Sequence, residues 1–238
     1  MGVGTVSGEV ENTLGSFLAV VDAGLRWVEV DVRRTADDVL VAKHDPIVAD
    51  GRFVAALTAG ETDALGLLRV ADLLDALPAG VGIDVEIKTS LEDALRPRDR
   101  TTAALAAGLL AQERRDMLVS SFDPAALVIV RELAPALPVG LLTWMRYPLR
   151  KAIPAAVHLG AGAVVPHVSS LGFGSNPVAY LDRPAAQLVA VAHDAGLEVA
   201  VWCPTPGEAD PLIAAGVDCL IVDHASTRTW AGAAGSLR

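Results

Sequence analysis

Short apolar runs alternate with amphipathic segments along most of this chain. The runs predict strands at Trp27–Arg33, Leu40–His44, Gly82–Lys88, Met117–Phe122, Val139–Trp144, Ala161–Val168, Glu198–Cys203 and Asp218–Asp223. Segments rich in alanine and leucine predict helices, among them Thr13–Ala23, Val70–Ala76, Thr101–Ala111, Pro124–Ala134 and Pro184–Ala195. Continuous apolar strands separated by helices are typical of a parallel sheet that is covered on its outside.

The number and order of these elements predict an α/β fold, a TIM (β/α)8 barrel. An open doubly wound sheet is disfavoured because no Gly-x-Gly-x-x-Gly motif follows a first strand. Two irregular stretches, Ile47–Asp63 and Pro166–Arg183, predict loops after strands, on the face where barrels carry their chemistry. Asn12 or Thr13 is expected to cap the first helix.

Charged side chains interrupt two of the predicted strands at alternate positions. Glu29 and Asp31 share one face of the first strand, and Glu86 and Lys88 share one face of the third, because residues i and i+2 of a strand point the same way. His44, followed by Asp-Pro, ends another apolar run. Charges are rare on buried strand faces unless something pairs with them. These residues therefore indicate a site for a hard cation and an anionic substrate.

The composition is consistent with a single domain over residues 1–238. Hydrophobic residues make up 52% of the chain, and a net charge of −10 argues against a nucleic-acid or anionic-membrane partner. Cys203 and Cys219 lack metal-type spacing and are expected to be buried, reduced thiols. No run reaches the roughly 18 apolar residues of a transmembrane segment, and Met1–Val10 has no signal-peptide pattern. We therefore expect a cytoplasmic protein.

Several short motifs occur in a fixed order along the chain. They are Glu11-Asn12-Thr13, Glu29-Val30-Asp31-Val32, His44-Asp45-Pro46, Glu86-Ile87-Lys88, Ser120-Ser121-Phe122-Asp123-Pro124, Val201-Trp202 and the stretch from Ala215 to Asp223. Each alone occurs by chance in many strands. Together, in this order and spacing, they resemble the signature of the glycerophosphodiester phosphodiesterase family over nearly the whole chain.

The resemblance implies a phosphoric diester hydrolase of lipid metabolism. Its small-molecule substrate would be a glycerophosphodiester, cleaved to an alcohol and glycerol 3-phosphate. Glu29, Asp31 and Glu86 would bind a divalent cation, Mg²⁺ or Ca²⁺, since hard cations prefer oxygen ligands. Lys88 would contact a phosphate oxygen. The alternative for Lys88 is a salt bridge to Glu86 or Asp31 with no ligand involved.

The other implied site residues lie before and after these strands. His44 would be the acid that protonates the leaving alcohol. Trp202 would either pack against the substrate or belong to the core at the barrel mouth. Glu11 would support the metal ligands from behind or only orient the first helix. Asn12 would hydrogen-bond within the site or only cap the helix.

The start of the chain departs from the family pattern. The family opens with a strand that ends in His-Arg-Gly, and here Gly2-Val3-Gly4 occupies that place. Either the chain begins upstream of Met1, or this member has lost half of its acid–base pair. For the chain from Met1 we expect a first strand of the barrel that is missing or truncated, and impaired hydrolysis. The strands at Trp27–Arg33 and Asp218–Asp223 would then have unpaired edges, which favour association into a homo-oligomer.

Other functions remain to be weighed against the hydrolase. An inactive barrel that binds a phosphorylated ligand or a metal would explain the absent histidine. A Schiff-base aldolase with Lys88 as nucleophile would need a lowered lysine pKa, and neighbouring carboxylates would raise it. A binuclear hydrolase is disfavoured because no His-x-His occurs at a strand end.

Overall fold

Eight strands form one curled sheet in the computed structural model, which describes residues 10–177, 181 and 183–222. The strands are β1 (Trp27–Arg34), β2 (Leu40–Ala42), β3 (Gly82–Ile87), β4 (Met117–Ser121), β5 (Val139–Thr143), β6 (Ala163–Pro166), β7 (Glu198–Trp202) and β8 (Cys219–Ile221). Their order in the sheet is β2-β1-β3-β4-β5-β6-β7-β8. All neighbours from β1 to β8 pair in parallel, as predicted.

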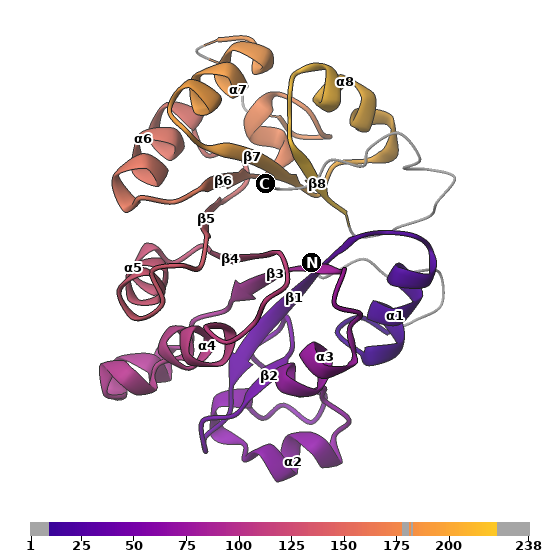
Figure 1. Ribbon diagram of the computed structural model, residues 1–238, viewed down its shortest axis with the longest axis vertical. Helices are drawn as coiled ribbons and strands as arrows, with labels where there is room; N and C mark the ends of the chain where they lie inside the picture. Colours follow the sequence, from indigo (N-terminus) through magenta and orange to yellow (C-terminus); the bar gives the residue numbers. More distant parts are fainter. Residues whose placement is uncertain (1–9, 178–180, 182, 223–238) are drawn as a thin grey trace.

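Helices cover the outside of the curled sheet (Figure 1). They are α1 (Leu14–Asp22), α2 (Ala59–Ala64), α3 (Val70–Ala76), α4 (Thr102–Leu110), α5 (Pro124–Leu133), α6 (Leu149–Leu159), α7 (Ala185–Asp194) and α8 (Ala209–Ala214). Short 3-10 helices are η1 (Val54–Ala56), η2 (Leu91–Leu95), η3 (Arg98–Arg100), η4 (Val168–Leu171) and η5 (Pro206–Glu208). In the described part of the chain, no helix is long and apolar enough to cross a membrane.

Three details differ from the pattern-based predictions. Strand β2 is antiparallel to β1, because the few residues after Arg34 can close a hairpin but not a parallel crossover. The predicted loop Ile47–Asp63 contains η1 and most of α2, which begins at a capping box between Thr58 and Glu61. Helix α6 was not predicted, since Pro154 lies inside it and proline usually ends a helix.

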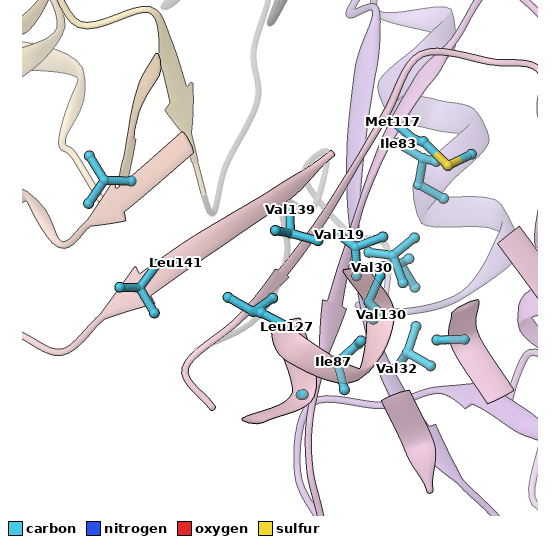
Figure 2. Packing of buried hydrophobic residues seen from close by; sticks show 14 of the residues in the cluster. Val30, Val32, Ile83, Ile87, Met117, Val119, Leu127, Val130, Val139 and Leu141 are labelled. Carbon is cyan, nitrogen blue, oxygen red and sulfur yellow. The ribbon is translucent and has the colours of Figure 1, made fainter. Parts of the chain in front are cut away.

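Alternation along the strands divides the buried residues into two layers. The outward-facing residues of the sheet pack under the helices, and Figure 2 shows Leu127 and Val130 of α5 beside Val119 of β4. A smaller cluster fills the inside of the curl, with Leu118, Leu142, Ala163, Val165 and Ala200 at its centre. The inward positions of β1 and β3 carry acidic side chains instead. The curl therefore has an apolar side and an acidic side.

The two free edges of the parallel sheet belong to β1 and β8. Within the described residues, β8 pairs only with β7, and β2 covers only the C-terminal part of β1. The expected absence of a first strand concerns residues 1–9, which lie outside the described residues. The α/β fold and the curled sheet are confirmed, whereas the missing strand stays a prediction.

Close packing of Trp27 on Gly82 supplies a test of the β1–β3 register. The two residues are paired across the strands, and a Cβ at Gly82 would lie 2.4 Å from the Trp27 indole. Gly82→Ala should lower the free energy of unfolding by about 1–3 kcal/mol, as overpacking does. Gly108→Ala in α4 meets open space and should stabilise by about 1 kcal/mol. Urea unfolding of both variants measures the difference, and equal stability of the two would contradict this register.

Candidate active site

The register of β1 and β3 places four carboxylates side by side inside the curl. Glu29 pairs with Asp84, and Asp31 pairs with Glu86. Asp31 is 1% exposed, Asp84 is 5% exposed and Glu86 is 9% exposed, so water solvates them poorly. All four point inward because they occupy alternate positions of two parallel strands. The strand pairing thus concentrates negative charge at one place in the protein interior.

Three of these carboxylates have the geometry of a cation site. Glu29, Asp31 and Glu86 each offer one carboxylate oxygen, and these three atoms all lie within 4.8 Å of one another. Within the described part of the chain, Glu29 Oε1 and Asp84 Oδ1 are buried without a hydrogen-bond partner. Buried oxygen atoms of this kind are costly unless a cation or a proton compensates them. The donor set, all carboxylate oxygen, fits a hard divalent cation.

Burial and mutual repulsion raise the pKa values of Glu29, Asp84 and Glu86. Burial is the main cause of the raised pKa of Glu29, and the charges of Asp31 and Glu86 add to it. Burial also raises the pKa of Asp84 to about 7, although the nearby Ser120 hydroxyl lowers it. The pKa of Glu86 is raised by burial, although the Lys88 ammonium opposes this. In the absence of a cation, these shifts favour the protonated carboxyl groups of Glu29, Asp84 and Glu86.

Lys88 supplies the cluster with a positive charge. Its Nζ lies 2.9 Å from Asp31 Oδ1 and also forms an ion pair with Glu86. Burial alone would lower the pKa of Lys88, but Asp31 and Glu86 outweigh it and the pKa is raised. A charged lysine cannot act as a Schiff-base nucleophile, so the aldolase alternative loses its support. The salt bridge weighed as the alternative for Lys88 is present in this arrangement.

The segment before α1 contacts the cluster through Asn12. Its Nδ2 donates a hydrogen bond of 3.1 Å to Asp31 Oδ2, and its backbone has a positive φ of 57°. Thr13, not Asn12, caps α1, by accepting a hydrogen bond from the Ser16 amide. Glu11 precedes Asn12 and is half-buried. Asn12 therefore orients a predicted metal ligand rather than the helix.

His44 follows β2 and is held at the rim of the cluster. Nε of Arg33 donates a hydrogen bond of 2.9 Å to the carbonyl oxygen of His44. The imidazole Nδ1 lies 2.9 Å from Asp45 Oδ1, and the side chain is 27% exposed. A carboxylate at Nδ1 fixes the orientation of the ring. Arg33 thus holds the backbone of His44, and Asp45 holds its imidazole.

Aromatic side chains line the mouth opposite the carboxylates. The rings of Phe122 and Trp144 stack at a centroid distance of 4.3 Å, and Trp202 meets Phe122 edge-on at 5.7 Å. His167 contacts Trp202 at 4.3 Å. Lys88 Nζ lies 5.8 Å from the Phe122 centroid, which joins this wall to the charged cluster. A ligand held by Lys88 would therefore have aromatic surface beside it.

Sequence analysis missed five residues at this site, and one signal would have found them. Asp84 and Arg33 lie two positions from Glu86 and Asp31 on the same inward strand faces. Phe122, Trp144 and His167 continue the inward alternation of β4, β5 and β6 by one step past each strand. Extending the period of two beyond each apolar run identifies all five. His224 lies outside the described residues.

A hollow of about 660 Å³ lies at the opposite end of the strands. Its walls include Trp27, Arg115, Gly162 and Glu198, at the N-terminal ends of the strands. None of the four clustered carboxylates lines it. Barrel chemistry takes place at the C-terminal ends, so the charged cluster and not this hollow marks the active site.

The raised pKa of Asp84 predicts a loss of stability with rising pH. Between the usual aspartate pKa and about 7, the folded chain holds a proton that the unfolded chain has released, so stability falls as pH rises across this range. Asp84→Asn should reduce the fall in melting temperature between pH 5 and pH 8 in EDTA. Asp72→Asn, an exposed change on α3, should leave it as in the parent. An unchanged pH dependence in Asp84→Asn would contradict the assignment.

The structure resembles solved structures that share its fold. A crystal structure from Silicibacter pomeroyi superposes with a TM-score of 0.76 at 24% identity, covering 93% of this chain and 87% of that chain. A phosphodiesterase from Oleispira antarctica, solved in complex with sn-glycerol-3-phosphate, superposes with a TM-score of 0.74 at 22% identity, covering 92% of this chain and 90% of that chain. At these identities the likeness establishes the fold.

The sequence comparisons identify the family. "Probable glycerophosphodiester phosphodiesterase 2" of Mycobacterium tuberculosis is 31% identical over 105 residues, which span 39% of this chain and 39% of that relative. The sequence profile of the Glycerophosphoryl diester phosphodiesterase family matches residues 4–227. The chain belongs to the glycerophosphoryl diester phosphodiesterase family of hydrolases.

Proposed function

We propose that this chain is a metal-dependent hydrolase that cleaves glycerophosphodiesters to an alcohol and glycerol 3-phosphate. The observation that carries the proposal is the cluster of Glu29, Asp31 and Glu86 with Lys88 beside it. Phosphodiester cleavage needs charge neutralisation at the phosphate and proton transfers to and from oxygen. The relative solved with sn-glycerol-3-phosphate and the family membership support this substrate class.

Glu29, Asp31 and Glu86 would hold Mg²⁺ or Ca²⁺. Either ion would neutralise charge on the phosphate. It would also lower the pKa of the hydroxyl group that attacks phosphorus. Asn12 would keep Asp31 in place through its hydrogen bond, with Glu11 behind it. The carboxylates must be ionised to bind the ion, so cation binding would release protons that the raised pKa values of Glu29 and Glu86 help to retain.

Lys88 and Trp202 would bind the substrate. When a cation takes over Asp31 and Glu86, the Lys88 ammonium is free to contact a phosphate oxygen. Trp202 is half-buried, and its Nε1 donates a hydrogen bond of 3.2 Å to the Thr143 carbonyl, which fixes the indole. A fixed ring at the mouth offers an apolar face to the glycerol carbons.

His44 would give its proton to the leaving alcohol. Its Nδ1 lies 2.9 Å from Asp45 Oδ1, which orients the imidazole for this transfer. Gly2-Val3-Gly4, at the place of the family's His-Arg-Gly, has no side chain that can transfer a proton. Water would have to make the second transfer, which forfeits about 10²–10⁴-fold in rate. We therefore expect residues 1–238 by themselves to hydrolyse the substrate slowly. A single domain over residues 1–238, a cytoplasmic location and a homo-oligomer are further predictions.

Hydrolysis and thermal stability together test this proposal. The purified chain is assayed on glycerophosphocholine and glycerophosphoethanolamine with Mg²⁺ and with Ca²⁺, by release of glycerol 3-phosphate. We expect slow, cation-dependent release and a melting temperature that rises with cation, since a ligand of the folded state stabilises it. Glu86→Gln should abolish both effects. Glu132→Gln changes an exposed surface carboxylate on α5 and should preserve both.

The outcomes separate the hydrolase from its alternative. A thermal shift that Glu86→Gln removes, with no release of glycerol 3-phosphate, would favour a barrel that binds a metal or a phosphorylated ligand without turnover. A thermal shift that survives in Glu86→Gln would contradict the ligand assignment itself. Release that does not depend on a cation would contradict metal dependence.

A further inference from the structure

Arg33 and Lys88 form a row of two cations at the mouth of the site. Below them, the pairing of β1 with β3 gives two inward rows of carboxylates. The amide of Lys88 donates a hydrogen bond of 3.0 Å to the carbonyl oxygen of Val32, so the parallel register continues by one residue and brings Arg33 beside Lys88. Arg33 follows Asp31 by two positions on β1, which starts its side chain on the inward face. The interior thus changes from negative to positive at its C-terminal end.

Two of the three nitrogens of the Arg33 guanidinium hold the segment that carries His44. Nε and Nη2 both donate hydrogen bonds to the His44 carbonyl oxygen, at 2.9 Å for Nε. Among the described residues, no group accepts a hydrogen bond from Nη1. A guanidinium offers five N–H donors in one plane, and both donors of Nη1 are left over. Because Arg33 is only half-buried, these donors can meet a ligand.

Carboxylates balance the charge of Arg33 when no ligand is bound. Burial lowers the pKa of the guanidinium, whereas the carboxylates of Asp31, Asp45 and Glu86 raise it. Arginine stays protonated here, since its ordinary pKa lies far above neutral pH. When a divalent cation neutralises Asp31 and Glu86, the positive charges of Arg33 and Lys88 lose part of this balance. An anion between the two side chains would restore it.

The phosphate of a phosphodiester is an anion that fits this row. Arginine binds phosphate oxygens through parallel N–H groups, and lysine binds them as a point charge. Two cations on neighbouring strands can therefore hold two oxygens of one phosphate. The guanidinium would keep its hydrogen bonds to the His44 carbonyl at the same time. The phosphate and the segment of the proposed acid would then share one support.

We propose that Arg33 is a substrate-binding residue of this site, which donates hydrogen bonds from Nη1 to a phosphate oxygen of the substrate beside Lys88. The proposal rests on the proposed function and adds to it a contact that holds the phosphate next to His44. Because the contact is made to the phosphate, the product glycerol 3-phosphate retains it. Loss of Arg33 should therefore weaken the binding of this product as well as slow its formation.

Binding of glycerol 3-phosphate to the cation-loaded chain tests this contact without turnover. Saturating Ca²⁺ occupies the carboxylates and leaves Arg33 and Lys88 to the phosphate, and the product is titrated in by calorimetry. Arg33→Gln should weaken product binding about 10-fold or more, because a hydrogen bond between charged groups is lost. Ca²⁺ should bind to Arg33→Gln at least as tightly as to the parent, since a neighbouring positive charge is gone.

Two further variants complete the comparison. Arg52→Gln removes the same charge from an exposed side chain in the loop after His44, where it pairs with Asp50 and Glu61, and should leave product binding as in the parent. Arg33→Lys keeps the charge without the forked donors and should weaken product binding about 3-fold. This second variant decides the matter if Arg33→Gln does not fold.

The measurements separate the phosphate contact from a structural role and from the hydrolase. Unchanged product affinity in Arg33→Gln would overturn the proposal, and slower hydrolysis in that variant would then show that Arg33 only holds the His44 carbonyl. Equal losses in Arg33→Gln and Arg52→Gln, or weaker Ca²⁺ binding in Arg33→Gln, would also overturn it. So would a parent that binds Ca²⁺ but no glycerol 3-phosphate, or, where Arg33→Gln does not fold, unchanged product affinity in Arg33→Lys. Product binding that depends on Arg33, in a parent that hydrolyses no glycerophosphodiester, would count against the hydrolase alone.

Discussion

Excess negative charge inside the curled sheet is the constraint on which this structure depends. Glu29, Asp31, Asp84 and Glu86 lie on two adjacent strands, and Lys88 is the single ammonium that pairs with them among the described residues. Unpaired buried charge is costly, and one lysine cannot balance four carboxylates. The cluster must therefore retain protons or bind a cation. The raised pKa values of Glu29 and Asp84 favour retained protons, and the spacing of the carboxylate oxygens permits a bound cation.

The fold maintains this charge by fixing the strand register. A slip of one residue between β1 and β3 would turn the carboxylates outward and the valines inward. Val30 and Val32 are fully buried under the helices, in the layer that Figure 2 shows, so such a slip would cost the core its packing. The apolar burial on one face of β1 thus stabilises the unfavourable charge on the other. Apolar packing outside the curl therefore offsets the cost of keeping the charges of the site buried.

The alternation of side chains along each strand predicted the strands and the centre of the site. A period of two can be recognised in the local sequence without knowing the rest of the fold. It placed Glu29, Asp31 and Glu86 on inward faces without knowledge of the sheet. It did not predict that β2 returns antiparallel, which depends on the length of one turn. It left open whether Lys88 contacts a phosphate or pairs with Glu86 and Asp31, and the structure has the pairing. The aromatic wall was missed for a related reason. Phe122 and Trp144 are apolar residues just past the ends of the paired strands β4 and β5, so only continuing the alternation beyond those ends identifies them as inward-facing.

Calorimetric titration of Mg²⁺ and Ca²⁺ into the parent chain and into Lys88→Met, at pH 8, tests the central claim most directly. If the ammonium and the divalent cation compete for Asp31 and Glu86, removal of the ammonium should tighten cation binding. The parent should release protons on binding, because the pKa values of Glu29 and Glu86 are raised. Weaker or absent cation binding in a folded Lys88→Met chain would contradict the account.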